Sequence, residues 1–257
     1  MKQILIAALI VGIVIVTYSQ SKPSKSAHLW WESGREWLRQ GELDKALPEF
    51  DRAIAASPRF APAWYSRGIV RFLNRDYVAA RADFDQAIKL NPKFTDAYVS
   101  RGMLYADWGK AERALRDLSH ALTLNPRNAR AYHYRAAVKL HRQDYDGAIR
   151  DNSRAVRLDP KHAQAWCDRG KARYFKDDLT AALADLNHAL KLEPTLTAAL
   201  FHRGLVHWRR GQAEAAEADF AACVKLDPAW AERIAALKRI SYVAPEVLPS
   251  AALREFF

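Results

Sequence analysis

The sequence predicts an all-α fold, an α-solenoid in which antiparallel helix pairs stack in a row and a capping helix closes the end. The segment AWYSRGIVRFL begins at residue 63, and related segments begin at residues 97, 131, 165 and 199, each 34 residues after the one before. Counted from residue 27, every period has alanine at position 20 and proline at position 32. A strict period of this length is typical of helical repeat arrays, whose repeats fold by packing on their neighbours.

An apolar segment comes before the repeats. Residues 4–16 are uncharged and almost wholly apolar, and residues 20–26 are expected to be a linker that contains serine, lysine and proline. A segment of this length is typical of a secretory signal peptide or of an uncleaved membrane anchor. The lack of an A-x-A cleavage motif favours the anchor. Residues 1–19 are therefore predicted to be an anchor or signal segment that contacts the membrane through residues 4–18, and a first helix docked on the repeats is the alternative.

The expected location follows from this segment. Signal-like N termini usually export the chain that follows, so we expect a membrane-associated protein whose repeats lie outside the cytoplasm, on the periplasmic side of a bacterial-type envelope. Positive charges flank the apolar segment on both sides, at Lys2 and at Lys22 and Lys25, so they specify little orientation. Repeats on the cytoplasmic face are the alternative.

Six repeats follow without an insertion. Each is expected to contain two helices of about a dozen residues, which are too short to be stable alone in water. Most repeats have an aromatic residue at position 4, glycine at position 8, and phenylalanine or leucine at position 24 of the second helix. Large side chains thus face small ones across each helix pair, which lets the two backbones approach closely. The predicted repeats span residues 27–60, 61–94, 95–128, 129–162, 163–196 and 197–230.

The spacings W-x3-G and A-x3-F-x2-A, with the closing proline, resemble the tetratricopeptide repeat family over residues 27–230. The resemblance implies a right-handed superhelix and a non-enzymatic scaffold that binds a peptide or a partner helix in its concave groove. In that family the first helix of each repeat lines the groove, with ligand contacts at positions 2, 5, 9, 12 and 13. Carrying these positions over gives the candidate groove residues Trp31, Arg35, Tyr65, Ile69, Asp96, Val99, Met103, Arg130, His133, Cys167, Lys171, Phe201 and Leu205. Contact with the next repeat is the alternative for each aromatic residue among them.

Arginine stands at position 7 from the second repeat onward, where the family pattern has leucine. Aspartate stands at position 23 of the same repeats. A partly buried charge needs a partner, so we predict a ladder of ion pairs that sets the register of the hairpins and has no catalytic role. The predicted pairs are Arg67 with Asp83, Arg101 with Asp117, Arg135 with Asp151, Arg169 with Asp185, and Arg203 with Asp219.

The fourth repeat departs most from the pattern, with Ala136 in place of glycine and Asn152 in place of a large apolar residue. A buried amide needs hydrogen-bond partners, so this repeat is predicted to be the least stable. After the last repeat, residues 231–242 have the apolar spacing of a capping helix, which repeat arrays require at an exposed end. Residues 243–257 are predicted to form a tail.

The motifs of common enzymes are missing. The sequence contains no GxSxG, no HExxH, no phosphate-binding loop and no dinucleotide fingerprint. The two cysteines, Cys167 and Cys223, form no CxxC pair and the histidines are scattered, so we predict no catalytic residue, no metal and no cofactor. Another protein is the expected partner, and the sequence carries no indication of the oligomeric state.

The formal net charge of +11 raises a second function. Positions 22, 26, 29 and 33 of the second helices carry no acid in any repeat, which predicts a basic ridge on the convex face. The ridge is a candidate for binding an anionic lipid surface or RNA, and RNA is the weaker alternative because no aromatic residue interleaves the bases. Helix electrostatics alone also favours bases near helix ends. The ridge residues are Lys89, Lys93, Arg116, Arg127, Arg150, Arg154, Arg157 and Lys161.

Overall fold

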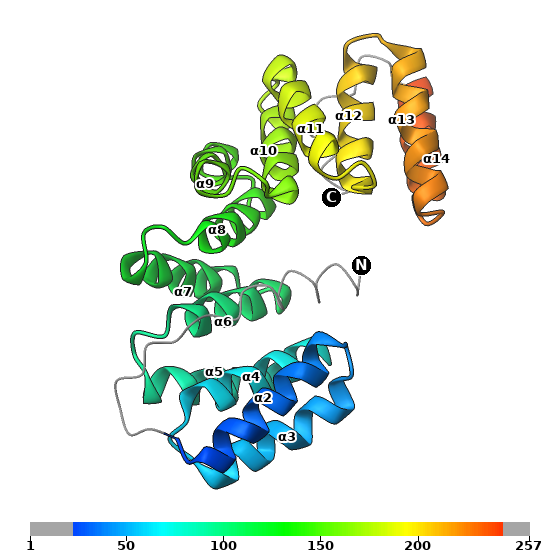
Figure 1. Cartoon of the computed structure of the whole chain (residues 1–257). Helices are drawn as coiled ribbons and strands as arrows, with labels where there is room; N and C mark the ends of the chain where they lie inside the picture. Colours follow the sequence, from blue (N-terminus) through cyan, green and yellow to red (C-terminus); the bar gives the residue numbers. More distant parts are fainter. Residues whose placement is uncertain (1–22, 244–257) are drawn as a thin grey trace. The chain divides into compact units, whose positions relative to one another are not determined.

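The computed structural model describes residues 23–243, and all the regular structure in this part of the chain is helical (Figure 1). Thirteen helices, α2 to α14, follow one another without a strand among the described residues. The chain forms two compact units, unit 1 with residues 1–126 and unit 2 with residues 127–257. In each unit successive helices pair as antiparallel hairpins, so the predicted α-solenoid of stacked helix pairs is confirmed as the fold class.

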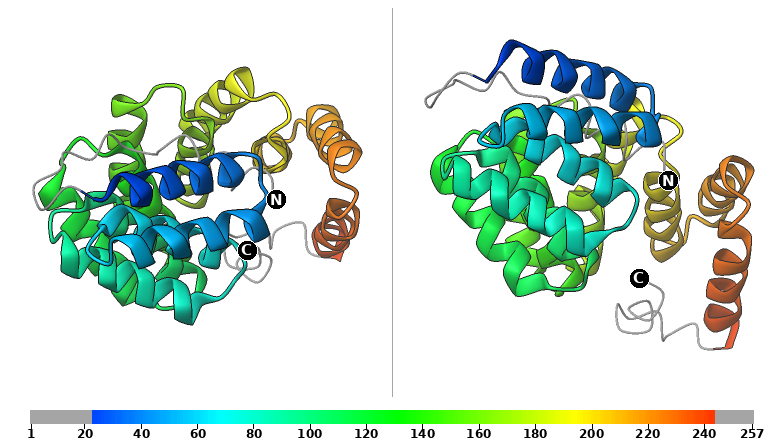
Figure 2. Two further views of the ribbon diagram at one scale, coloured as in Figure 1. Left: turned by 60° about the horizontal axis from the view of Figure 1, so that its bottom comes forward. Right: turned by 90° about the horizontal axis from the view of Figure 1, so that it is seen from below.

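Unit 1 contains three hairpins. The two helices of each hairpin pack on each other, and the second helix of one hairpin packs on the first helix of the next. Figure 2 shows these hairpins, drawn in blue to green, lying one beside the next. The helices are α2 (Lys25–Arg39), α3 (Leu43–Ala56), α4 (Ala61–Leu73), α5 (Tyr77–Leu90), α6 (Thr95–Asp107) and α7 (Ala111–Leu124).

Unit 2 repeats this arrangement and adds a final helix. Its first helices α8, α10 and α12 also contact one another in turn, so they form a continuous surface, here called the first-helix face of unit 2. The added helix α14 packs on α13. The helices are α8 (Ala129–His141), α9 (Tyr145–Leu158), α10 (Ala163–Phe175), α11 (Leu179–Leu192), α12 (Thr197–Arg209), α13 (Ala213–Leu226) and α14 (Trp230–Val243).

The turn inside each hairpin is built in two ways. Three repeats place glycine in the left-handed region, for example Gly41 at φ 79°, and the helix that follows such a turn has no side-chain cap. The other three place a larger residue there, for example Gln143 at φ 64°. In those repeats the next residue is an aspartate whose carboxylate accepts a hydrogen bond from the first turn of the second helix, as Asp144 does from Gly147 N at 2.9 Å. The aspartate cap satisfies a free backbone N–H group and offsets part of the strain of a side chain in this region.

The core of each hairpin rests on close contact between its two helices. The alanine at position 20 is at most 2% exposed in every repeat. At Gly68 an added Cβ atom would lie 2.7 Å from Cε1 of Phe84, closer than real Cβ contacts allow. Glycine is needed there because the ring of Phe84 occupies the space of a side chain.

The helix bounds differ slightly from the expected ones. Ser24 caps α2 by accepting a hydrogen bond from Ala27 N at 3.1 Å, so the helix begins at Lys25, within the linker expected over residues 20–26. Helix α14 extends one residue beyond the expected capping helix 231–242 at each end. The predicted anchor over residues 1–19 and the tail after Val243 lie outside the described residues. Within residues 23–243, no helix is both long enough and apolar enough to cross a membrane.

Candidate functional site

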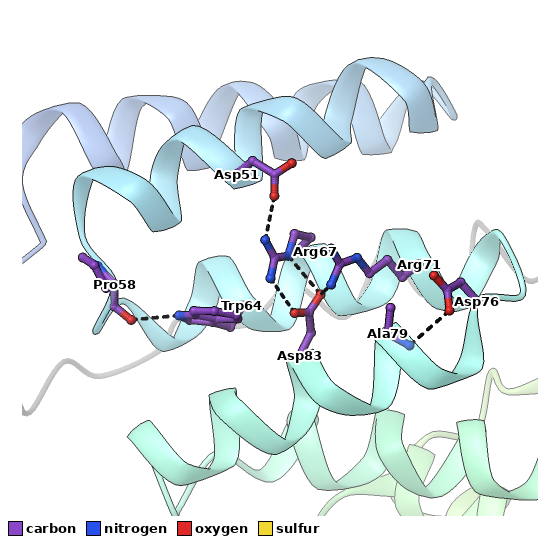
Figure 3. Close-up of polar contacts among 8 residues, drawn as sticks. All are labelled: Asp51, Pro58, Trp64, Arg67, Arg71, Asp76, Ala79 and Asp83. Carbon is purple, nitrogen blue, oxygen red and sulfur yellow. Dashed lines mark hydrogen bonds and ion pairs between the residues drawn. The ribbon is translucent and has the colours of Figure 1, made fainter.

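The structure brings together the members of all five arginine–aspartate pairs. In the second repeat Arg67 donates from Nε to Asp83 Oδ2 at 3.0 Å and from an Nη atom to Oδ1 at 2.7 Å (Figure 3). The other four pairs repeat this two-point contact with distances of 2.6 to 2.9 Å. Each aspartate is buried, so its negative charge depends on this partner.

Four ladder arginines, one after another in each unit, also reach the preceding repeat of their own unit. The second Nη atom of Arg67 donates to Asp51 Oδ1 at 2.6 Å, and Arg101 contacts Asp85 at 2.6 Å in the same way. In unit 2 the corresponding acceptors are Ser153, contacted by Arg169, and Asn187, contacted by Arg203. These acceptors all stand at position 25 of their repeats. This recurrence is visible in the sequence, but it was not used to predict the contact. The arginine therefore ties its hairpin to the one before it.

A second base completes the ladder in three repeats. Position 11 holds Arg71, Lys139 or Arg173, and each donates to the aspartate of its own hairpin at 2.7 to 2.8 Å. Burial raises the pKa of Asp151, but its hydrogen bonds from Arg135 and Lys139 outweigh burial, so the pKa stays below its ordinary value. The base at position 11 thus supplies a second cation to a buried carboxylate.

Most of the candidate groove residues are buried. Phe201 is 1% exposed and packs on the rings of Phe220 and Trp230. The indole of Trp31 is also buried, so the expectation that exposed aromatic rings line the groove is not met at these two positions. Arg35, Tyr65, Asp96, Arg130 and Lys171 keep partial exposure. The buried candidates are Trp31, Ile69, Val99, Met103, His133, Cys167, Phe201 and Leu205.

Position 5 of one repeat makes a regular contact with position 6 of the next. In unit 1 Trp31 Nε1 donates to Ser66 Oγ at 2.9 Å, and the hydroxyl of Tyr65 lies 3.2 Å from that of Ser100. In unit 2 this contact joins His133 Nε2 to Asp168 Oδ2 at 2.9 Å. The first helices are therefore linked by neutral groups in unit 1 and by an imidazole and a carboxylate in unit 2.

An open cavity lies on the first-helix face of unit 2, between α8 and α10. Its volume is about 430 Å³. The rings of Tyr145 and Phe175, both in its lining, stack at 5.1 Å with an angle of 15° between their planes. Its walls therefore combine an apolar surface with a few polar groups, as ligand sites do. The lining residues are Ala137, Leu140, His141, Gln143, Tyr145, Asp168, Lys171 and Phe175.

Two ionisable groups meet in this cavity. Asp168 accepts hydrogen bonds from His133 and, at 3.0 Å, from Gln164 Nε2. Burial raises the pKa of Asp168, but the hydrogen bond from His133 and the charges of His133 and Lys171 keep it below the ordinary value. Burial lowers the pKa of Lys171, and Asp168 offsets only part of that effect. The cavity thus holds an ionised carboxylate whose two oxygens are engaged and a lysine partly removed from water.

Lys171 alone among the predicted groove residues lines the cavity. Positions 12 and 13 are contact positions in the family, but no candidate was drawn from them. The cavity is lined by three residues at these positions, Leu140, His141 and Phe175. Gln143 and Tyr145 belong to the turn and the start of the second helix. Their place in the cavity follows from the packing of α8 on α10 and has no signal in the sequence.

The other predicted features are placed as follows. All eight residues of the basic ridge are exposed. Cys167 and Cys223 are buried, and burial raises the pKa of Cys223 to about 11, so its thiol is a weak nucleophile at neutral pH. In the described part of the chain, no group of three or more histidine, cysteine or acidic residues is arranged to hold a metal ion.

The described chain is a helical repeat scaffold. Its helix pairs stack, its ladder arginines and aspartates pair with each other, and the first-helix face of unit 2 is open. The chain belongs to the tetratricopeptide repeat family, whose sequence model matches residues 32–95, 99–166 and 167–229. Proteins of this family are generally non-catalytic scaffolds for protein–protein interaction. None of the curated protein sequences matches the chain.

Solved structures with the same fold have low sequence identity to the chain. A chain of the APC/C hetero-tetramer Cut9–Hcn1 is 18% identical with a TM-score of 0.74 over 88% of this chain, which spans only 43% of that one. PilW, described as a widely conserved type IV pilus biogenesis factor, is 16% identical with a TM-score of 0.72 over 80% of this chain and 95% of its own. YrrB, described as having an unusual peptide-binding site, is 19% identical with a TM-score of 0.58 over 74% and 97%. At these identities the likeness concerns the fold alone.

Proposed function

We propose that the chain is a non-enzymatic scaffold that binds an extended or helical protein segment on the first-helix face of unit 2. The observation that carries the proposal is the cavity of about 430 Å³, which positions 9, 12 and 13 of neighbouring first helices line together. Its stacked rings and its few polar groups suit one side chain of a partner and the backbone beside it. The peptide-binding site attributed to YrrB supports a peptide as the type of ligand.

The setting that we propose is a membrane-tethered or exported chain in an envelope assembly. It rests on the apolar residues 4–18, which precede the repeats, and on a likeness of fold to PilW, described as a type IV pilus biogenesis factor. The repeats would lie on the periplasmic side. A cytoplasmic position is the alternative.

A second candidate function is binding of an anionic lipid surface or RNA by the basic ridge. The observation in its favour is that Arg150, Arg154 and Arg157 are exposed along one side of α9, four and three residues apart. Residues at these spacings share a face of a helix, so their positive charges add there.

One experiment separates these functions. A photoreactive p-benzoylphenylalanine replaces Ala137 in the cavity of the full-length chain, and a matched chain carries it at Arg154 on the ridge. Irradiation in cells is expected to give a discrete protein adduct from position 137 and none from position 154. Lipid or RNA adducts from position 154 alone would favour the second candidate, and no protein adduct from position 137 would contradict the proposal.

The same cells report the location. A C-terminal tag on the chain is expected to resist protease in intact cells and to be digested once the outer barrier is opened. Protection until lysis would instead place the repeats in the cytoplasm.

A further inference from the structure

The first helices of the two units differ in their acids. Helices α2, α4 and α6 of unit 1 contain four carboxylates, at Glu32, Glu36, Asp96 and Asp107. Helices α8, α10 and α12 of unit 2 contain one, Asp168. The first-helix face of unit 2 is therefore poor in negative charge.

Most bases of the same helices contact an acid, as Arg209 does with Asp177 at 2.7 Å. Those at positions 7 and 11, such as Arg135 and Arg169, are paired with the buried aspartates of the ladder. Lys171 lies instead in the cavity on the first-helix face. Asp168, three residues before it, accepts hydrogen bonds from His133 and Gln164, and its charge also favours the charged form of Lys171. The lysines and arginines of α8, α10 and α12 nevertheless outnumber the acids on these helices and the aspartates paired with them, so this face carries a net positive charge.

Basic groups on α12 and α14 add to this charge: the guanidinium of Arg233 on α14 lies 5.2 Å from the ring centre of Trp230, which packs at 4.7 Å on Phe201 of α12. Burial lowers the pKa of Lys171, and the charge of Arg233 on α14 lowers it further. On α12, His202 is 4% exposed, and burial, with the charges of Lys171 and Arg233, holds its pKa well below the ordinary value. These groups disfavour one another's positive charge, so an anion placed beside them would relieve a repulsion as well as gain an attraction.

The cavity beside Lys171 supplies an apolar surface in addition to these basic groups. Leu140, Tyr145 and Phe175 form apolar walls, and the stacked rings of Tyr145 and Phe175 hold each other in place. A volume of about 430 Å³ accommodates one large apolar side chain. A ligand that matches both features carries an apolar anchor with carboxylates near it.

We propose that the segment bound by unit 2 is an acidic protein segment, with a large apolar side chain in the α8/α10 cavity and carboxylates facing Lys171 and Arg233. This inference rests on the proposed function and deepens it by naming the chemistry of the partner. Charge complementarity selects the acidic segment over neutral and basic ones, and the apolar walls select a protein over a nucleic acid.

The test uses three pools of fluorescein-labelled twelve-residue peptides and the full-length chain in a non-ionic detergent. All pools share a central phenylalanine and randomised uncharged neighbours, and four flanking positions are all glutamate, all glutamine or all lysine. Fluorescence anisotropy is expected to show the glutamate pool binding about tenfold more tightly than the glutamine pool and the lysine pool binding most weakly. Lys171→Met and Arg233→Met are each expected to weaken binding of the glutamate pool about threefold to tenfold.

Lys191→Met is the matched control. Lys191 is exposed on α11, and its substitution removes the same charge from the chain as Lys171→Met does. It is expected to leave binding of the glutamate pool unchanged. Circular dichroism of each variant verifies the helical fold, and the exposed Arg233 gives a second variant if Lys171→Met unfolds the chain.

Equal affinity for the glutamate and glutamine pools would overturn the inference and leave the proposed function standing. Displacement of the glutamate pool by an equal concentration of a twelve-nucleotide oligouridylate would overturn it in favour of a nucleic acid. If no pool binds while position 137 still yields a protein adduct, the acidic preference is wrong and the groove is still used. If no peptide pool binds and position 137 yields no protein adduct, the proposed function itself is contradicted.

Discussion

The hairpins α4/α5 and α8/α9 have the same ion-pair cluster, but their two helices pack on each other through different residues. Arg67 and Arg71 surround Asp83 in the first, and Arg135 and Lys139 surround Asp151 in the second. In α4/α5 the helices meet at Gly68 against the ring of Phe84. In α8/α9 they meet at Ala136 and Asn152, both completely buried.

The difference shows which part of the repeat is replaceable. Neither amide atom of Asn152 has a hydrogen-bond partner in the described structure, which costs roughly 1 to 3 kcal/mol for a buried polar group. The fold nevertheless keeps the same helix pair there. The ion-pair cluster thus persists where the apolar contact has changed, so the hairpin forms with either kind of contact between positions 8 and 24.

The largest effect is expected from removing the shared carboxylate. Asp151→Ala leaves Arg135 and Lys139 close together without the buried carboxylate that they share and should lower the free energy of unfolding by about 3 kcal/mol. The double change Arg135→Met with Asp151→Ala should cost less, because only one cation remains. Urea unfolding followed by circular dichroism measures both, and equal costs would show that the pairing is unimportant. Asp83→Ala in α4/α5 is the matched change and is expected to cost less, because Arg67 keeps its contact with Asp51 at 2.6 Å.

A smaller loss is expected from giving α4 the residue that α8 has at the same position. In Gly68→Ala the new Cβ atom would lie 2.7 Å from the ring of Phe84, which is fully buried, so the ring would have to shift. Overpacking of this kind should lower the free energy of unfolding by about 2 kcal/mol. The double variant Gly68→Ala with Phe84→Leu should recover part of the loss in the same assay. A stable single variant would show that the helices can separate at no cost.

The smallest effect is a gain in α8/α9. Ala136→Gly with Asn152→Leu copies the pair Gly170 and Leu186 of the next repeat. It removes a buried amide without partners and should raise the free energy of unfolding by about 1 kcal/mol. Hydrogen exchange of α8 and α9 should slow in this variant, while Ala136→Gly alone should destabilise by about 1 kcal/mol through its lower helix propensity. No gain in the double variant would refute the prediction that Asn152 makes this repeat the least stable.

The residue pairs of the ladder could be predicted from the sequence. Of the residues that line the cavity, only Lys171 was predicted. Arg67 and Asp83 stand at fixed positions of a repeat whose two helices must face each other, so their spacing alone implied a contact. Phe201 and Trp31 also stand at positions that face the groove in the family, yet both are buried. Trp31 packs on Phe60 and donates to Ser66 of the next repeat, whereas Phe201 packs on Phe220 of its own hairpin and on Trp230 of the final helix. Whether a first-helix side chain faces solvent depends on the neighbours that pack on it.

The sequence by itself determined the period, the helix pairs and the arginine–aspartate partners, because each of these arises within one repeat or between positions that recur at a constant spacing. Only the tertiary structure decided that His133 links to Asp168 and that a cavity opens beside Lys171. These features depend on how the surface of one hairpin meets the next. That fit is set by the shapes of many side chains together, so no single position of the repeat carries a signal for it.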